Sequence, residues 1–377
     1  MLAPVLAVAI CVHPPPTRAM ERSPFQRAAP SSRQQDPASF ESRSTKAAEA
    51  RAAGRLEEAA GQYARALALR PAWAEGRLAL ATILFDLKRY PEAREHLLQL
   101  TATPEGDGVA WALLGLAASR LRDYDTALTS LGRARSLGIP IPGMLSTVLL
   151  ETALLLNRAG NHDGAFDLLR GFANEGEDRP PVIVALGLSM LRLRQMPDEV
   201  RPEKYEMVRL AGRGGYQMAR ARRTSLGRLA LEELVSRYPS EPNVHYALGT
   251  YLAPEDPDAA VEELRRELRL NADHAEALIQ IAHIETRRGN AIAALPLAEK
   301  AVSLAPDVPA GRLVLGQALL DMERTDDAIV QLERAVSLAP ESGMIYFALS
   351  RAYQRAGRTE EATRAREEFL RLQKLGH

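Results

Sequence analysis

The stretch that decides the fold is WALLGLAASRLRDYDTALTSLGRARSLGIP, residues 111–140. Leucines and alanines recur in it three and four positions apart, a spacing that places them on one face of a helix. Small residues such as Gly115 and Ala127 allow two helices to cross closely. Pro140 ends the stretch because proline cannot continue a helix. The segment therefore predicts a pair of short helices that pack against each other.

This pattern recurs along the chain at an interval of 34 residues. Alanine marks the interval twice over, at Ala59, Ala93 and Ala127 and at Ala260, Ala294, Ala328 and Ala362. An apolar residue followed by a small one precedes the alanine by about twelve residues, at Leu80–Ala81, Leu114–Gly115, Ile281–Ala282 and Leu315–Gly316. One such helical pair cannot bury its apolar face alone, so stacked pairs must supply the core.

These residues make the chain resemble the tetratricopeptide repeat (TPR) family. The best single match consists of Trp111, Leu114, Gly115, Tyr124, Ala127, Leu131, Ala134 and Pro140. The resemblance implies an all-α fold, an α-α superhelix in which antiparallel helix hairpins form a right-handed solenoid. We expect this architecture to occupy nearly the whole chain after its first forty residues.

The repeat register divides the chain into blocks. We expect a TPR block of about four repeats at 40–179 and one of about five at 208–377. Between them, 180–207 departs from the pattern and predicts one helix followed by a linker or distorted helix, where a hinge or kink would fit. Residues 1–39 predict a signal or anchor segment followed by a disordered linker rich in proline, serine and arginine.

The start of the chain is compatible with two interpretations. The apolar run Leu2–Val12 is too short to span a bilayer but suits the core of a signal peptide with an exit near Ala19. Alternatively, Met20 is the true initiator. The first interpretation predicts a periplasmic or secreted protein and the second a cytoplasmic one. Contact with a membrane is expected only if the N-terminal segment is retained.

Composition removes several classes of function. The chain has 48 basic and 48 acidic residues, so its net charge gives no general reason to bind nucleic acid. The single cysteine, Cys11, excludes a disulfide framework and cysteine zinc sites. The glycine-rich run at 212–215 lacks the lysine and hydroxyl of a phosphate-binding loop. We predict no catalytic residue, no metal and no cofactor, and therefore no enzyme.

The resemblance also predicts where a partner would bind. In TPR proteins the first helix of each repeat lines a concave groove that holds an extended peptide or a helix. Carried over by register, the groove candidates are Tyr246, Thr250, His283, Leu313, Gln317, Phe347 and Arg351. Aromatic, amide and guanidinium side chains of this kind can anchor a peptide and bond its backbone.

A second set of candidates lies just upstream. Arg209, Arg213, Tyr216 and Arg220 stand at offsets of 0, 4, 7 and 11, which predicts one basic stripe along a helix. Guanidinium groups suit carboxylate or phosphate because they bond both oxygens at once. This stripe makes an acidic protein segment one candidate partner.

Two of these arginines also resemble the TPR carboxylate clamp. Arg209 and Arg213 match the basic pair with which clamp domains grip chaperone C-termini. The match stops there, because Leu150 and Leu154 stand where the family has lysine and asparagine. Binding of a chaperone tail is therefore not expected.

The leading hypothesis is a non-enzymatic scaffold or adaptor that binds a peptide or helix of another protein in its concave groove. Two alternatives stay open. One is an exported cell-envelope assembly factor with the same binding mode. The other, less favoured at zero net charge, is an RNA-binding helical repeat that uses the cluster from Arg209 to Arg228. The partner's identity and the oligomeric state are not predicted.

Overall fold

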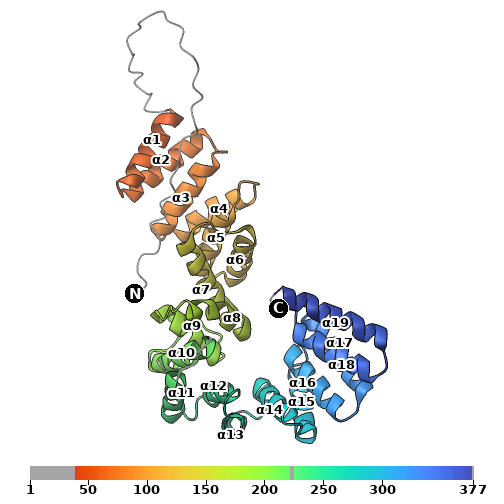
Figure 1. Cartoon of the computed structure of the whole chain (residues 1–377). Helices are drawn as coiled ribbons and strands as arrows, with labels where there is room; N and C mark the ends of the chain where they lie inside the picture. The colour runs from red at the N-terminus through yellow and green to blue at the C-terminus, as the bar shows by residue number, and fades with distance from the viewer. Residues whose placement is uncertain (1–38, 221–224, 376–377) are drawn as a thin grey trace, which may run out of the picture. The chain divides into compact units, whose positions relative to one another are not determined.

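The computed structural model describes residues 39–220 and 225–375, and within these ranges the secondary structure is helical throughout, with no strand (Figure 1). This confirms the all-α prediction. The α-helices are α1 (Phe40–Ala52), α2 (Leu56–Leu69), α3 (Ala74–Asp86), α4 (Tyr90–Thr101), α5 (Gly108–Arg120), α6 (Tyr124–Leu137), α7 (Pro142–Ala159), α8 (His162–Asn174), α9 (Pro180–Met190), α10 (Tyr205–Ala219), α11 (Ser225–Arg237), α12 (Val244–Leu252), α13 (Pro257–Leu270), α14 (Ala275–Arg287), α15 (Ala291–Leu304), α16 (Pro309–Asp321), α17 (Thr325–Leu338), α18 (Gly343–Arg355) and α19 (Thr359–Lys374). Two short 3-10 helices, η1 (Pro197–Glu199) and η2 (Pro202–Lys204), separate α9 from α10.

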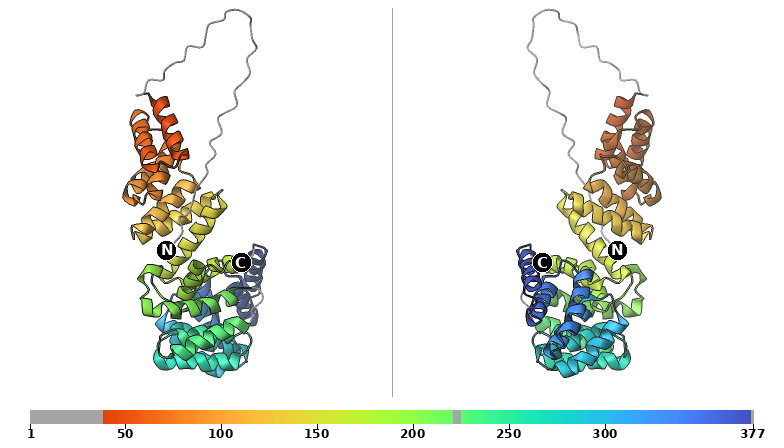
Figure 2. Two further views of the ribbon diagram at one scale, coloured as in Figure 1. Left: turned by 90° about the vertical axis from the view of Figure 1, so that its left-hand side faces the viewer. Right: turned by 90° about the vertical axis from the view of Figure 1, so that its right-hand side faces the viewer.

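The chain forms two compact units that divide between Leu156 and Asn157, inside α7. Unit 1 comprises the described residues up to 156, and unit 2 comprises those from 157 onward. Within each unit consecutive helices pack side by side (Figure 2). The predicted blocks at 40–179 and 208–377 follow repeat register rather than compactness, and they stay a prediction of how the repeats group.

The 34-residue interval has a direct packing cause. The alanines that mark it have no exposed surface in six repeats, at Ala59, Ala93, Ala127, Ala260, Ala294 and Ala328. The glycine of the first helix touches a leucine of the second so closely that an added Cβ would lie 2.6–2.7 Å from it. These pairs are Gly115 with Leu131, Gly249 with Leu264 and Gly316 with Leu332. A side chain larger than hydrogen would therefore push the two helices of a repeat apart.

The turn between the two helices of most repeats contains a residue in the left-handed region. Within each run of repeats, these residues are also 34 positions apart. The residues with φ between 61° and 74° at this position are Gly54, Lys88, Arg122, Gly289, Glu323 and Gly357. Arg192, with φ of 52°, occupies the same place after α9. The segment α9 is therefore the first helix of a repeat whose second helix, α10, is delayed by the insertion that carries η1 and η2.

Helix α10 packs against both of its sequence neighbours, α9 and α11. Its glycine-rich run serves this packing: an added Cβ on Gly212 would overlap the backbone carbonyl of Ile183 in α9, and one on Gly214 would overlap Leu231 in α11. Likewise, an added Cβ on Gly187 of α9 would overlap the backbone carbonyl of Val208 in α10. The run at 212–215 is thus a helix-packing surface.

The N-terminal prediction falls almost entirely outside the described part of the chain. Of residues 1–39, only Ser39 is described, and its hydroxyl accepts the backbone N–H of Ser42 at 3.1 Å at the start of α1. Among the helices that the structure describes, none combines the length and apolar character needed to cross a membrane.

Candidate functional site

A cavity of about 830 Å³ lies in unit 2. Its lining comes from α8, from the end of α9, from α10, from α12 with the loop after it, and from α14. Four residues predicted from the sequence line it together: Arg220, Tyr246, Thr250 and His283. The first closes α10, the next two lie on α12, and His283 lies on α14. This cavity is the candidate binding site.

The remaining residues of the predicted basic stripe lie outside the cavity lining. Arg209 is partly exposed and pairs with Glu206 at 2.9 Å, and Arg213 is exposed on α10. Tyr216 is buried, with the guanidinium carbon of Arg220 5.7 Å from its ring centre. Along α10, the exposed Arg213 and Arg220 therefore stand on either side of the buried Tyr216 in the sequence.

The predicted candidates beyond α14 also lie outside this cavity. Leu313 is buried in α16, and Gln317 is partly buried on the same helix. On α18, Phe347 is exposed and its ring centre lies 5.4 Å from that of Phe369, while Arg351 is exposed. Their role in binding stays a prediction.

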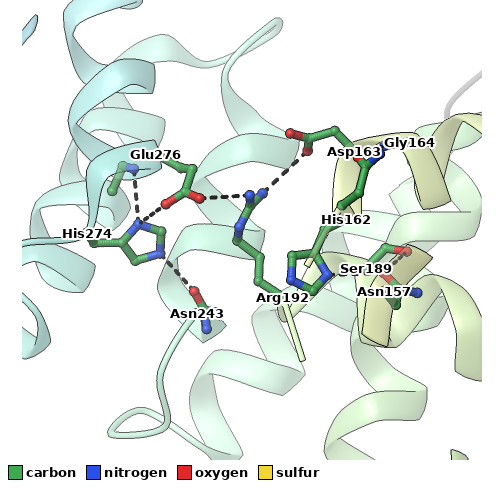
Figure 3. A network of polar contacts seen from close by, with 11 residues as sticks. Asn157, His162, Asp163, Gly164, Ser189, Arg192, Asn243, His274 and Glu276 are labelled. Atoms are coloured by element: carbon green, nitrogen blue, oxygen red, sulfur yellow. Dashed lines mark hydrogen bonds and ion pairs between the residues drawn. The ribbon is translucent and has the colours of Figure 1, made fainter. Parts of the chain in front are cut away.

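Arg192 joins two sides of the cavity (Figure 3). One of its terminal nitrogens lies 3.4 Å from Asp163 Oδ1 at the start of α8, and the other lies 2.8 Å from Glu276 Oε1 on α14. The guanidinium carbon also sits 5.8 Å from the centre of the Tyr246 ring. The Arg192 side chain is 14% exposed and that of Glu276 32%, whereas that of Asp163 is 86% exposed, so solvent screens the pair with Glu276 less than the pair with Asp163. Arg192 therefore ties α8, α12 and α14 together.

A second set of contacts surrounds Glu276, the residue of α14 that pairs with Arg192. The His274 ring stacks on Tyr246 with centres 4.8 Å apart, and its Nε2 donates to Asn243 Oδ1 at 2.8 Å. Its Nδ1 lies 3.2 Å from the backbone nitrogen of Ala277 and 3.3 Å from Glu276 Oε2. Hydrogen bonding by His274 and the charge of Arg192 lower the pKa of Glu276 to about 2. Glu276 is thus a fixed anion at neutral pH.

A buried hydrogen-bonded group centred on Asn157 holds the start of α8 in place. Asn157 has no exposed surface, and its Oδ1 accepts from His162 Nδ1 and from Ser189 Oγ, both at 3.1 Å. Its amide nitrogen donates to the carbonyl of Ala185 at 3.1 Å. Burial, with a further contribution from Arg192, lowers the pKa of His162 to about 4. The imidazole is therefore neutral at physiological pH.

This neutral histidine predicts that unit 2 is sensitive to acid. The unfolded chain takes up the His162 proton near pH 6.5, whereas the folded chain does so near pH 4. Acidification between these values therefore favours unfolding, and the contribution to stability present above pH 6.5 is lost as pH falls. We expect a loss of about 2 kcal/mol between pH 6.5 and 4 that His162→Gln reduces, measured by urea unfolding with circular dichroism. An unchanged pH slope in the variant would contradict the assignment.

Sequence reasoning missed the wall that α8 contributes. Phe166, Asp167 and Arg170 line the cavity, yet α8 is the second helix of its repeat and register predicts only first helices there. The insertion between α9 and α10 interrupts the repeat register, and the cavity is lined by α8 and α10 as well as by first helices. The repeat interval gave no signal of this displacement, because Arg192 lies 70 residues after Arg122 and so does not keep the spacing of 34. Within the described ranges no cluster of histidine, cysteine and acidic side chains could hold a metal ion.

Comparison with known proteins agrees with the observed helices. Models described as tetratricopeptide repeat match residues 50–117, 112–180 and 285–342. Cellulose synthase operon protein C of Xanthomonas axonopodis pv. citri (strain 306) is 33% identical over 146 residues, which is 36% of this chain. The match spans only 10% of that protein's length.

Among solved structures, a crystal structure of MamA is 19% identical and covers 46% of this chain and 94% of its own, with a TM-score of 0.36. MamA from Desulfovibrio magneticus RS-1 is 23% identical and covers 39% of this chain and 84% of its own, with the same TM-score of 0.36.

Proposed function

Since the chain belongs to the tetratricopeptide repeat family, we propose that it is a non-enzymatic interaction scaffold. Its unit 2 cavity binds a segment of another protein. The observation that carries the proposal is the convergence of Tyr246, Thr250, His283 and Arg220 on one cavity. The first three were expected to face a partner from repeat register, and Arg220 was expected to do so from its place in the basic stripe.

The composition of the cavity wall supports binding of a peptide. Phe166, Met190, Met218 and Ile284 supply apolar surface, and the methionines can adapt to differently shaped side chains. Gln280 brings an amide that can bond a peptide backbone. An apolar lining with a few polar groups is typical of sites that bury an anchoring side chain.

The arrangement of charges favours binding over catalysis. Arg192 is held by Asp163 and Glu276, and Arg170 pairs with Asp167 at 2.9 Å. His162, the buried histidine of the lining, is committed to Asn157. Arg192 and His162 fix helices to one another, and Arg170 pairs within α8, so these groups do not converge on a common reacting point as acid–base catalysis requires.

The experiment that tests the proposal is selection of peptides from a random twelve-residue display library with the full chain, followed by titration of the enriched peptides. We expect Phe166→Ala combined with Met218→Ala to weaken binding about tenfold, because it removes two apolar contacts from the cavity. The matched control is Ile292→Ala combined with Leu270→Ala, two exposed apolar residues outside the lining. Failure to enrich any peptide, or equal losses in both double variants, would refute the proposed site.

A further inference from the structure

The cavity in unit 2 carries positive charge that the chain does not neutralise. Four arginines and two aspartates line it. Arg192 and Arg170 have carboxylate partners, as given above. Arg220 and Arg287 have none within ion-pair distance among the residues that the structure describes. Residues 221–224, which follow Arg220, are Ala-Arg-Arg-Thr and supply no carboxylate.

These two arginines are positioned to meet a ligand. Both are exposed and both line the cavity. Arg220 is the residue at which α10 ends, where its guanidinium carbon lies over the Tyr216 ring. Arg287 lies in the last turn of α14, one turn beyond His283. Because both line the same cavity, a segment bound there can contact both.

The groups beside these arginines add no competing charge. Burial, and then the charge of Arg287, lower the pKa of His283, so its ring is neutral at physiological pH. Tyr246 stays a neutral phenol because burial raises its pKa to about 12. Met218, two residues before Arg220, and Ile284, three residues before Arg287, supply apolar lining. Cationic and apolar surface therefore lie together.

We propose that the unit 2 cavity selects a protein segment in which aspartate or glutamate stands near a large apolar residue, with Arg220 and Arg287 pairing with the carboxylates. The proposal rests on the proposed function and names the chemistry of its partner. Guanidinium groups bond carboxylates through two parallel N–H donors, which gives direction as well as attraction. The apolar residue of the segment packs against the methionines and Ile284.

The composition of the selected peptides gives the first test. In the random twelve-residue library screened against the full chain, we expect aspartate and glutamate to be enriched beside leucine, isoleucine or phenylalanine. Enriched peptides without excess acidic residues would overturn this inference while leaving the proposed function intact. No enriched peptide at all would overturn both.

Titration of one selected acidic peptide gives the second test. We expect the double variant Arg220→Gln and Arg287→Gln to bind about tenfold more weakly and with less dependence on salt. The control is Arg65→Gln with Arg133→Gln, which changes net charge equally at exposed positions of unit 1 and should leave affinity unchanged. Equal affinities in the two double variants would overturn the inference. Binding of a single-stranded polyuridine RNA of twenty nucleotides is measured as well. If this RNA bound more tightly than the peptide, and if the Arg220→Gln and Arg287→Gln variant lost that binding, the inference would also be overturned, because the site would then be a nucleic-acid site.

Discussion

Replacing Gly212 with alanine is expected to destabilise unit 2 by about 3 kcal/mol. The added methyl group would overlap the backbone carbonyl of Ile183, and Gly187 makes the reciprocal contact with the carbonyl of Val208. A backbone carbonyl in a helix cannot rotate away as a side chain can. The substitution must therefore separate α9 from α10, which loosens both apolar helix faces at once.

The measurement is urea unfolding followed by circular dichroism, with hydrogen exchange to locate the loss in α9 and α10. Gly171→Ala in α8 is the matched control, since nothing lies within 4 Å of the added methyl group there. That change should raise stability by about 0.5–1 kcal/mol through helix propensity. If the Gly212 and Gly171 variants shifted stability in the same direction, the close crossing would not be the reason for the glycine.

The regular repeats could be predicted from sequence because their packing is local. Ala127, Leu131 and Gly115 contact one another within a single helical pair, so their spacing records the contact directly. No regular spacing in the sequence indicates the crossing of α9 and α10. Gly212 touches a backbone atom 29 residues earlier, across an insertion of no regular length. The arginine spacing therefore predicted a helix through 212–215, but not the close contact with α9 that its glycines make.

The candidate site was predictable to the extent that it follows register. Tyr246, Thr250 and His283 face the cavity because first helices keep their orientation from repeat to repeat. The contact between Arg192 and Glu276 could not be predicted, since it joins residues 84 positions apart through the curvature of several stacked helices. No property of either residue type alone indicates that partner.

Replacing Glu267 with alanine is the second change expected to cost about 3 kcal/mol. Glu267 lies on α13 with no exposed surface, yet it caps the start of α12. Its two carboxylate oxygens accept the backbone N–H of Asn243 at 2.8 Å and of Tyr246 at 3.2 Å. The Asn243 side chain, which would normally cap the helix, is instead occupied by His274.

Removing this carboxylate leaves one buried and one partly buried donor without an acceptor, and it removes a negative charge from the positive end of α12. Glu267→Gln should cost less, about 1–2 kcal/mol, because one oxygen remains while the amide group opposes a backbone N–H. Glu262→Ala, at an exposed position of the same helix, should stay within about 0.5 kcal/mol of the parent. The readout is urea unfolding with hydrogen exchange of α12. Because Tyr246 lies at the start of α12, the Glu267→Ala variant should also lose peptide binding. Retained affinity in that variant would mean that the cavity does not depend on how α12 begins.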